Sequence, residues 1–431
     1  MLGFGKSANT SLLATLPPLS LYIHIPWCIR KCPYCDFNSH ETKSADAFTT
    51  KARAGVPKLH PLAAPRPTAG EELGKGGNTL RTEDEQRYID ALIADLDVTL
   101  PKVWGRRVHT VFFGGGTPSL FSAAGIDTIL AAVRARLPVE ADAEITLEAN
   151  PGTFEAEKFK GYRDAGVNRL SIGIQSFNAK HLTALGRVHN DTEAKRAIEI
   201  AQANFDNINL DLMFALPSQT LAECAKDVET ALSFGTNHLS IYHLTLEPNT
   251  LFHRFPPALP DDELAADMHE MIFDRLAAAG YQHYETSAYA KPGKQSRHNL
   301  NYWRFGDYIG IGAGAHAKLS LPDRIFRQVR HRQPQRFIDT AIAGDAVFEQ
   351  HDVESSQLGF EFMLNGLRLK QGIELARYSE RTGLPLNSIH PAIDEAVRQG
   401  WLQRDGGWIQ PTVRGYDLLN DVVELFLPAS D

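Results

Sequence analysis

The sequence predicts an α/β fold: a partial (β/α)6 parallel barrel followed by a mostly helical C-terminal domain that resembles a winged helix. From residue 20 to about 245, short runs rich in β-branched residues alternate with longer amphipathic stretches. Distinctive cysteine, glycine and Asn-Pro loops directly follow three of the short runs. Strands that alternate with helices in this way are typical of parallel βαβ units.

The repeating part contains six strand candidates and five long helix candidates. The strands are expected at 21–25, 109–114, 144–149, 169–174, 208–214 and 238–246. The helices are expected at 84–100, 121–137, 155–165, 191–204 and 219–233. Functional groups in such folds lie on the loops after the carboxyl ends of the strands, so we expect the site there.

Changes in composition divide the chain into four regions. We expect an N-terminal tail at 1–19, the barrel core at 20–250, an extension at 251–350 and the C-terminal domain at 351–431. A Pro- and Gly-rich insertion at 41–82, with seven Lys or Arg against four Asp or Glu, interrupts the core. We interpret it as a solvated loop, with a docking or lid role as the alternative.

The C-terminal domain is predicted to contain helices, a hairpin and a final helix. The helices are expected at 355–369, 373–382 and 387–399, and the hairpin strands on both sides of Asp405-Gly406-Gly407. A last helix begins at Thr412 or Val413. Because residues 351–431 carry seven basic and twelve acidic side chains, protein contact or a lid role is favoured over DNA binding.

The composition of the 431 residues is that of an ordinary soluble protein, with 43% hydrophobic residues and a net charge of −8. This charge disfavours nucleic acid as a partner. No stretch approaches the roughly 18 consecutive apolar residues of a membrane span, and the first 19 residues resemble no targeting peptide. Four unevenly spaced cysteines indicate a reducing compartment, and we expect a cytoplasmic protein.

Three of the four cysteines, Cys28, Cys32 and Cys35, form a C-x-x-x-C-x-x-C pattern directly after the first strand candidate. Thiolates are soft ligands for iron–sulfur clusters, and three of them can hold three corners of a cubane. One iron then remains open for another ligand. The spacing therefore predicts an iron–sulfur cluster.

Two other interpretations of the cysteines remain. Zinc would need a fourth ligand, for which His24, Asp36 and His40 are nearby. Three unrelated core thiols would need no ligand at all. Cys224, in a helical stretch, is interpreted as a small buried apolar residue.

A second loop, Gly114-Gly115-Gly116-Thr117-Pro118, follows the next strand candidate. Glycine lets the backbone approach a ligand closely, where a side chain would block it. One βα unit after the cluster loop, this turn is predicted to bind the amino end of a cofactor.

These motifs resemble those of a known family. The cysteine triplet with Tyr34 between its last two members, together with GGGTP, resembles the radical S-adenosylmethionine (SAM) superfamily. The segments IHIPWC, LEANP, RLSIGIQSF, LGRVH and NLDLMFALP are similar to those of the oxygen-independent coproporphyrinogen III oxidases and their relatives. The likeness runs from about 20 to 425, without the insertion.

The resemblance implies that the three cysteines hold a [4Fe-4S] cluster and that SAM chelates the open iron through its amino and carboxylate groups. An electron passed to the sulfonium would then break the C5′–S bond and yield a 5′-deoxyadenosyl radical. The implied SAM-binding residues are Tyr22 near cofactor and cluster, Gly115, Gly116 and Thr117 along the methionyl part, Glu148 and Arg187 on its polar groups, and Gln175 and Asp211 at the ribose.

Two features distinguish branches of this family. The oxidases carry a further cysteine two residues after the triplet, where this chain has Phe37. The run SRHNLNYW, Ser296 to Trp303, resembles the signature of a heme-chaperone branch. This likeness implies that His298 offers an imidazole to heme iron and that Tyr302 and Trp303 provide flat faces for the macrocycle. His316 is a weaker candidate for heme contact.

The leading hypothesis is thus a heme chaperone that binds heme, a [4Fe-4S] cluster and SAM and passes heme to an acceptor protein. The alternative is an oxygen-independent coproporphyrinogen III oxidase, and a third is a DNA-binding regulator. The implied partners of the chaperone are heme, acceptors such as respiratory enzymes, an electron donor for the cluster and a second copy of the chain.

Overall fold

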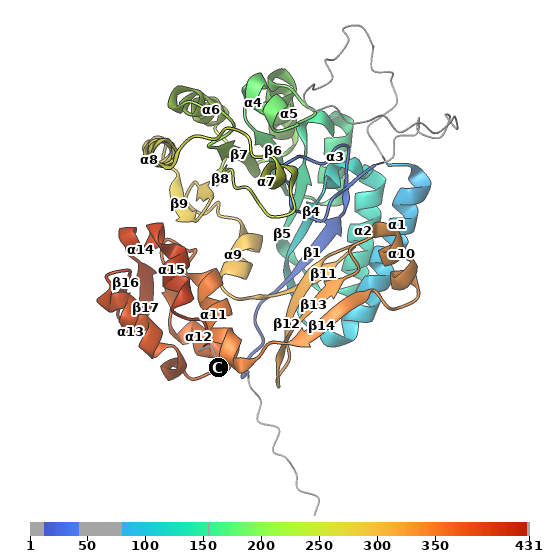
Figure 1. Cartoon of the computed structure of the whole chain (residues 1–431). Coiled ribbons are helices and arrows are strands. Elements are labelled where there is room, and N and C mark those ends of the chain that lie inside the picture. The colour runs from blue at the N-terminus through green and yellow to red at the C-terminus, as the bar shows by residue number, and fades with distance from the viewer. Residues whose placement is uncertain (1–12, 43–79, 154–155, 429–431) are drawn as a thin grey trace, which may run out of the picture.

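The computed structural model describes residues 13–42, 80–153 and 156–428 (Figure 1). Twelve of the described strands form one mixed sheet, in the order β14-β13-β12-β11-β1-β4-β5-β6-β7-β8-β10-β9. Its centre consists of the six predicted strands, all parallel. They are β1 (Leu19–Ile25), β4 (Val108–Gly115), β5 (Val139–Ala149), β6 (Arg169–Gln175), β7 (Ile208–Phe214) and β8 (His238–His243). The predicted α/β barrel fold is confirmed.

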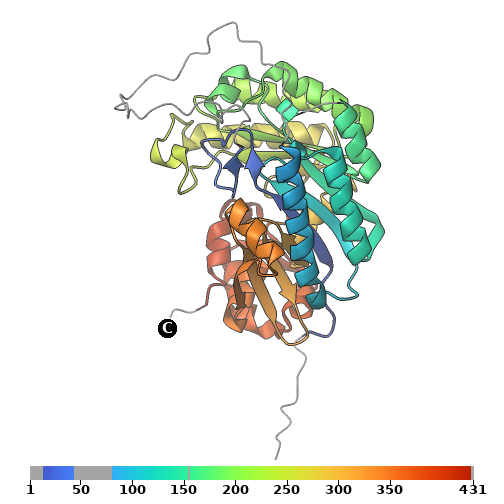
Figure 2. The ribbon, with the colours of Figure 1, turned by 90° about the vertical axis from the view of Figure 1, so that its right-hand side faces the viewer.

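The two faces of the central strands differ in chemistry. On β1, the buried Leu21 and Ile23 belong to the main hydrophobic core, whereas Tyr22 and His24 face the inside of the barrel. This alternation follows from the two-residue period of a strand. Helices cover the outer face (Figure 2), so the inner face is left for a polar site.

The predicted helices form within a few residues of their expected bounds. They are α1 (Thr82–Thr99), α2 (Ala123–Arg136), α3 (Ala156–Ala165), α5 (Asp191–Asn204) and α6 (Leu221–Ser233). Reciprocal capping boxes at Asn190 with Glu193 and at Thr220 with Glu223 fix the starts of α5 and α6. A short helix, α4 (Ala179–Ala184), was not predicted.

The 251–350 region completes both edges of the barrel sheet. The antiparallel strands β9 (Gln282–Glu285) and β10 (Ala288–Ala290) extend the sheet beyond β8. At the other edge, β11 (Asp307–Ile311) runs parallel to β1, followed by the antiparallel β12 (His316–Ser320), β13 (Ile325–Arg330) and β14 (Val347–Asp352). The helices of this region are α7 (Leu251–Arg254), α8 (Asp262–Ala278), α9 (Arg297–Trp303) and α10 (Pro334–Ile342).

The helix α9 lies near the amino ends of the barrel strands. The Glu144 carboxylate on β5 accepts hydrogen bonds from the backbone N–H groups of Arg297 and His298, at 3.2 and 3.0 Å. A carboxylate in this position satisfies two unpaired donors of the first helical turn. Glu144 therefore anchors the HNLNYW segment to the barrel.

The C-terminal domain contains the predicted helices and hairpin, with one correction. Residues Ile373–Glu374 begin as the strand β15, which pairs with β17, and the helix there starts only at Ala376. The elements are α11 (Ser355–Gly366), α12 (Ala376–Thr382), α13 (His390–Arg398), β16 (Leu402–Asp405), β17 (Trp408–Pro411), α14 (Val413–Asp417) and α15 (Leu419–Glu424).

The C-terminal domain has its own hydrophobic core, which reaches the barrel through α9. Leu300 and Trp303 of α9 pack against this core, and the ring of Phe305 lies 5.6 Å from that of Phe362. Two ion pairs, Arg327–Glu361 at 2.7 Å and Arg368–Glu285 at 3.2 Å, cross the same boundary. The domain is thus held against one side of the barrel (Figure 1).

Most of the predicted insertion, residues 43–79, and the start of the predicted tail lie outside the described residues. Among the described helices, none has both the length and the apolar character needed to cross a bilayer.

Candidate functional site

The cysteine loop follows β1, and its short strand β2 (Trp27–Cys28) pairs with β3 (His40–Glu41). A polar side chain lies beside each of the three sulfurs. The Thr117 hydroxyl donates to Cys28 Sγ at 3.6 Å, and Arg187 Nη1 donates to Cys32 Sγ at 3.7 Å. Cys35 Sγ and the Ser39 hydroxyl are 3.8 Å apart.

Burial and a neighbouring positive charge act in opposite directions on the thiolate form of the cysteines. Burial raises the pKa of the Cys28 and Cys35 thiols. Burial alone would lower the pKa of Arg187, but Tyr34 and Cys32 beside it raise that pKa overall. A permanently charged guanidinium next to a sulfur stabilises its thiolate form.

No group of three or more His, Cys, Asp or Glu side chains within residues 13–42, 80–153 and 156–428 is arranged to hold a metal ion. A zinc ion would need four such ligands around one point. A [4Fe-4S] cluster instead takes one thiolate on each iron. The three thiols lie on one loop and each has its own neighbouring polar side chain, so they fit three irons of such a cluster.

The glycine loop brings the end of β4 close to β1 and to the cysteine loop. Gly115 has φ +114°, and a Cβ there would lie 2.5 Å from the His24 ring. A Cβ on Gly116 would lie 2.5 Å from the Trp27 carbonyl oxygen. The Gly116 and Thr117 N–H groups donate to the Ile25 and Trp27 carbonyls, each at 2.7 Å. These glycines are therefore needed for close packing within the chain.

Acidic side chains meet inside the barrel beyond Gly115. The Gly115 N–H donates to Glu148 Oε2 at 3.2 Å. Burial, and after it the negative charge of Asp211, raises the pKa of Glu148 to about 8. Asp211 accepts hydrogen bonds from Ser171 at 2.9 Å and Asn209 at 2.8 Å, and burial raises its pKa. A cation bound here would relieve the repulsion between the two carboxyl groups.

The remaining predicted SAM residues lie at the carboxyl end of β6. Gln175 has φ +65°, a left-handed conformation that is uncommon outside glycine and often found at functional sites. Arg187 Nη2 donates to the Gly173 carbonyl at 2.8 Å, and a Cβ on Gly173 would lie 3.0 Å from Gln175 Nε2. The barrel thus gathers Gln175 and Arg187 near the cysteine loop.

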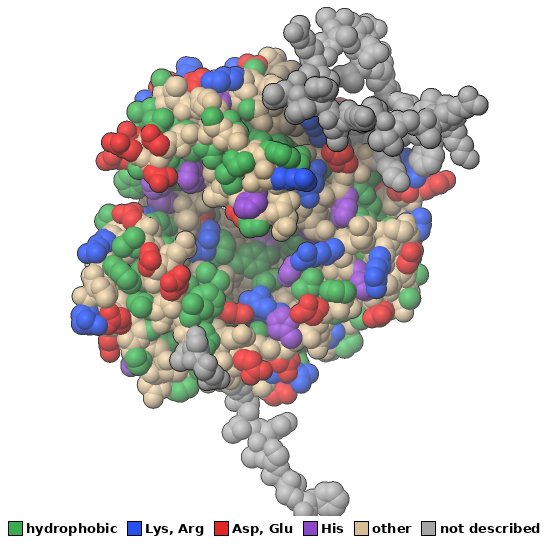
Figure 3. Space-filling model, viewed as in Figure 1, with side chains coloured by type: hydrophobic (Ala, Val, Ile, Leu, Met, Phe, Trp, Pro, Cys, Tyr) green, Lys and Arg blue, Asp and Glu red, His purple; other side chains and the backbone are tan. Residues whose placement is uncertain are grey.

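A cavity of about 750 Å³ opens beside these groups. Five of the predicted residues line it, namely Tyr22, Gly115, Glu148, Tyr302 and Trp303, and so does the weaker candidate His316. The face is hollowed near its centre, and Lys, Arg and His side chains gather beside the hollow (Figure 3). The cysteines, Gly116, Thr117, Gln175, Arg187, Asp211 and His298 do not line the cavity.

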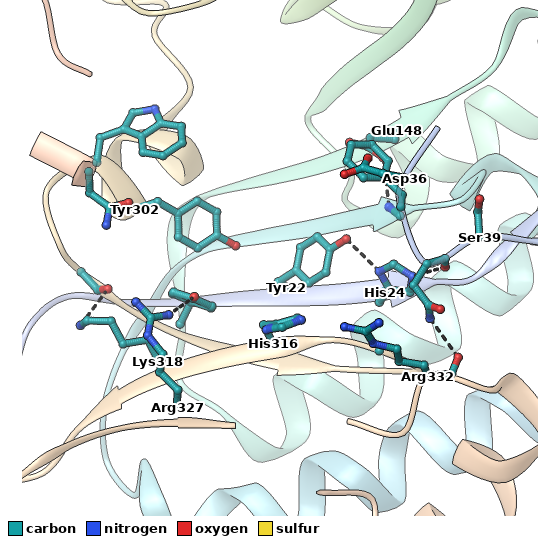
Figure 4. A pocket seen from close by; sticks show the side chains of 18 of the residues that line it. Tyr22, His24, Asp36, Ser39, Glu148, Tyr302, His316, Lys318, Arg327 and Arg332 are labelled. Atoms are coloured by element: carbon teal, nitrogen blue, oxygen red, sulfur yellow. Dashed lines mark hydrogen bonds between the residues drawn. The ribbon is translucent and has the colours of Figure 1, made fainter. Parts of the chain in front are cut away.

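Several residues that line the cavity were missed by the sequence analysis. They are Lys31, Asn38, Lys318, Arg327 and Arg332, of which the last three are labelled beside Tyr22 and His316 in Figure 4. His24, named only as a possible zinc ligand, and Phe37, named only as the residue in place of a cysteine, also line the cavity. The Asn38 amide donates to the Ala313 and Arg332 carbonyls, both at 2.9 Å, and so joins the cysteine loop to the β11–β13 edge. No local motif signals this pairing, because it joins segments some 275 residues apart.

His298 is buried, and both of its ring nitrogens are engaged. Nδ1 lies 2.7 Å from the Thr110 hydroxyl, and Nε2 lies 2.8 Å from the Tyr302 hydroxyl. Because Thr110 donates its own proton to Ser20, Nδ1 is the donor to Thr110 and Nε2 accepts from Tyr302. The ring stacks on Phe112, and burial lowers the pKa of His298 to about 3. As an iron ligand, His298 would have to give up the bond to Tyr302.

Relatives of the chain are known. Over 417 residues the chain is 47% identical to the heme chaperone HemW of Escherichia coli K12. The aligned region covers 96% of this chain and 100% of that protein. The chain belongs to the HemW family. Heme chaperones HemW of Haemophilus influenzae and Bacillus subtilis are 43% and 32% identical and cover 96% and 95% of the chain, with 98% and 99% of their own lengths matched.

Two stretches of the chain also match wider families. Residues 22–231 match the radical SAM superfamily, and residues 354–418 match the HemN C-terminal domain. The solved structure of coproporphyrinogen III oxidase HemN from E. coli has the same fold, with a TM-score of 0.73, 20% identity and coverage of 95% of this chain and 90% of that chain. The predicted radical SAM fold and the predicted family are confirmed.

Proposed function

We propose that the chain is a heme chaperone that binds heme in the cavity beside a [4Fe-4S] cluster and SAM and passes the heme to an acceptor protein. One observation carries this proposal. The same cavity is lined by Tyr22, Gly115 and Glu148 from the predicted SAM site and by the aromatic Tyr302 and Trp303. Cargo in the cavity would therefore lie next to the cofactor.

Cys28, Cys32 and Cys35 would hold the cluster, because each has a polar side chain directed at its sulfur. Glu148 and Asp211 would accept the amino group and the ribose hydroxyls of SAM, while Gln175 and Arg187 take further polar groups. A cluster held by these thiols would supply the electron needed to cleave the sulfonium of SAM. The protein orients the cofactor through the Gly115 backbone, which only glycine can bring this close to His24.

The cavity suits a large, flat, anionic ligand. Cofactor sites commonly have volumes of about 300–1,000 Å³ and combine apolar walls with a few placed polar groups. Here Tyr302, Trp303, Phe305 and Tyr308 provide aromatic surface, and Lys31 and Arg332 provide positive charge. Heme combines an aromatic macrocycle with two carboxylates, which match these two kinds of side chain.

The alternative function is anaerobic coproporphyrinogen III oxidation. Phe37, which stands where the oxidases have a further cysteine, lines the cavity and is 64% exposed. An apolar ring there supplies no thiol to the reaction space. The likeness to the HemN structure, at 20% identity, concerns the fold. Phe37 and the HNLNYW segment therefore favour heme transfer over decarboxylation.

The proposal includes partners beyond heme. A heme carrier needs an acceptor protein, such as a respiratory enzyme, and a reducible cluster needs an electron donor. Pairing of two chains is a further expectation from the family. Thiol ligands require reducing conditions, so we place the protein in the cytoplasm.

The test uses one sample of protein reconstituted anaerobically with iron and sulfide. Heme is titrated while its visible absorption is followed, and a second portion receives coproporphyrinogen III, SAM and a reductant. Saturable heme binding without vinyl products is the expected result. Turnover to vinyl products without stable heme binding would establish the oxidase instead.

A further inference from the structure

Three histidines line the cavity, and they differ in how their ring nitrogens are used. His24 Nδ1 lies 3.0 Å from the Tyr22 hydroxyl, and its Nε2 lies 2.9 Å from the Asn38 carbonyl oxygen. His40 Nε2 lies 3.3 Å from Asn38 Oδ1, and the Arg332 backbone also bonds to the ring. These two imidazoles support the cysteine loop and have little capacity for a metal.

His316 is the third, and within residues 13–42, 80–153 and 156–428 its ring makes no hydrogen bond or ion pair. It begins β12 and is exposed to the cavity. Figure 4 shows it close to Tyr22, with Arg327 and Arg332 on either side. A free imidazole is a strong axial ligand for heme iron.

We propose that His316 is the axial ligand of the heme iron and that Arg332 and Lys31 pair with the two propionates. This assignment rests on the proposed heme-chaperone function and specifies its cargo site. In this assignment His298 is not the iron ligand expected from the sequence. It positions Tyr302 against the macrocycle instead.

The protonation of His316 favours this role. Burial lowers its pKa, and the positive charges of Arg332 and Arg327 lower it further, against a smaller opposing effect of Glu349. A lowered pKa favours the neutral imidazole, which is the form that binds a metal. Arg332 would also attract a ligand that carries carboxylates.

The cations of the cavity fall into two groups. Lys318 is paired with Asp307 at 2.9 Å, and Arg327 with Glu361 at 2.7 Å, so their charges are already compensated. Neither Arg332 nor Lys31 has a carboxylate within ion-pair distance in the described part of the chain, and the Lys31 ammonium donates only to the Phe37 carbonyl, at 3.1 Å. Both lie beside His40. Two uncompensated cations thus match two propionates.

The first test titrates heme into His316→Ala, His298→Ala and wild-type protein, with His109→Ala as the control. His109 lies on β4 near the opposite end of the barrel and does not line the cavity. His316→Ala is expected to lose the spectrum of imidazole-ligated heme and about tenfold or more in affinity. Added free imidazole should restore the spectrum, because it can occupy the vacated position.

His298→Ala is expected to retain the wild-type spectral type with weaker binding. A wild-type spectrum and affinity in His316→Ala, or loss of imidazole ligation only in His298→Ala, would overturn the ligand assignment. Failure of the wild-type protein to bind heme would instead reject the proposed function itself.

The second test addresses the propionates with heme and its dimethyl ester as the two probes. Arg332→Ala should weaken the binding of heme several-fold and leave the binding of the ester unchanged, because only free carboxylates pair with the guanidinium. The control is Arg414→Ala, an exposed arginine of the C-terminal domain. Equal effects of Arg332→Ala on both probes, or none on either, would overturn the pairing.

Discussion

The Nε2 atom of His298 accepts a hydrogen bond of 2.8 Å from the hydroxyl of Tyr302, one turn later on α9. His298 is buried against Phe112, whereas Tyr302 lines the cavity. The bond therefore couples the inside of the barrel to the proposed heme site. It gives the histidine of the HNLNYW segment a positioning role.

Replacing His298 by alanine should lower the free energy of unfolding by about 3 kcal/mol, because it leaves a cavity and removes one hydrogen-bond partner from each of the Thr110 and Tyr302 hydroxyls. Denaturant unfolding of the apoprotein measures this loss. His109→Ala, which removes a partly exposed pair with Glu140, should cost no more than about 1 kcal/mol. Equal losses in the two variants would contradict the role given to His298.

Replacing Cys32 by alanine should abolish retention of the [4Fe-4S] cluster after anaerobic reconstitution. Two thiolates cannot hold a cubane that three hold, and the guanidinium of Arg187 would lose its sulfur partner. Iron and sulfide analysis with the visible spectrum gives the measurement. The control is Cys224→Ala, because Cys224 is buried in α6 within the hydrophobic core. Full cluster content in Cys32→Ala would refute the ligand assignment.

Gly115→Ala should destabilise the protein by about 2 kcal/mol or more and weaken SAM binding. An alanine there would have to keep the positive φ of Gly115, and its Cβ would lie only 2.5 Å from the His24 ring. Gly105→Ala is the matched control, since it has φ +74° with nothing within 4 Å of the new Cβ. It carries the backbone strain alone, about 1 kcal/mol. Calorimetric titration with SAM and thermal unfolding distinguish the two variants.

Glu148 should make the stability of the cofactor-free protein depend on pH. Its folded-state pKa of about 8 lies above its ordinary value of 4.5, so its stabilising contribution is complete below pH 4.5 and is lost as pH rises toward 8. The free energy of unfolding of the wild type should therefore fall relative to that of E148Q across this range, by at most about 1.4 kcal/mol per pH unit.

Denaturant unfolding of both proteins at several pH values between 5 and 8 checks this difference. Other titrating groups are common to the two proteins and cancel. Parallel stability profiles would show that the carboxyl group of Glu148 is not raised in pKa.

The sequence predicted the parts of the fold that repeat. The strands β1 and β4 to β8 are mostly buried runs that each contain at least one β-branched residue, and the helices between them have clear periodicity or capping boxes. The edge strands β9 and β10 have only four and three residues, which is too short for a periodic signal. Residues Ile373–Glu374 pair with β17 although their sequence continues into a helix.

The candidate site was predictable where a motif carries it and hidden where the tertiary fold assembles it. The cysteines and the glycine loop belong to compact local patterns. Arg332 and Lys31 line the same cavity only because β11 pairs with β1 and the Asn38 amide donates hydrogen bonds across that edge. The hydrogen bonds that engage His298 likewise depend on Thr110, 188 residues away.

The most direct test of the heme-carrier account is an equilibrium heme titration of the reconstituted wild-type protein beside Trp303→Ala and Trp104→Ala. Trp303 lines the cavity, while Trp104 is 83% exposed outside it. We predict saturation at about one heme per chain, with affinity reduced in Trp303→Ala and unchanged in Trp104→Ala. Binding without saturation, or the same affinity in all three proteins, would contradict a heme site in this cavity.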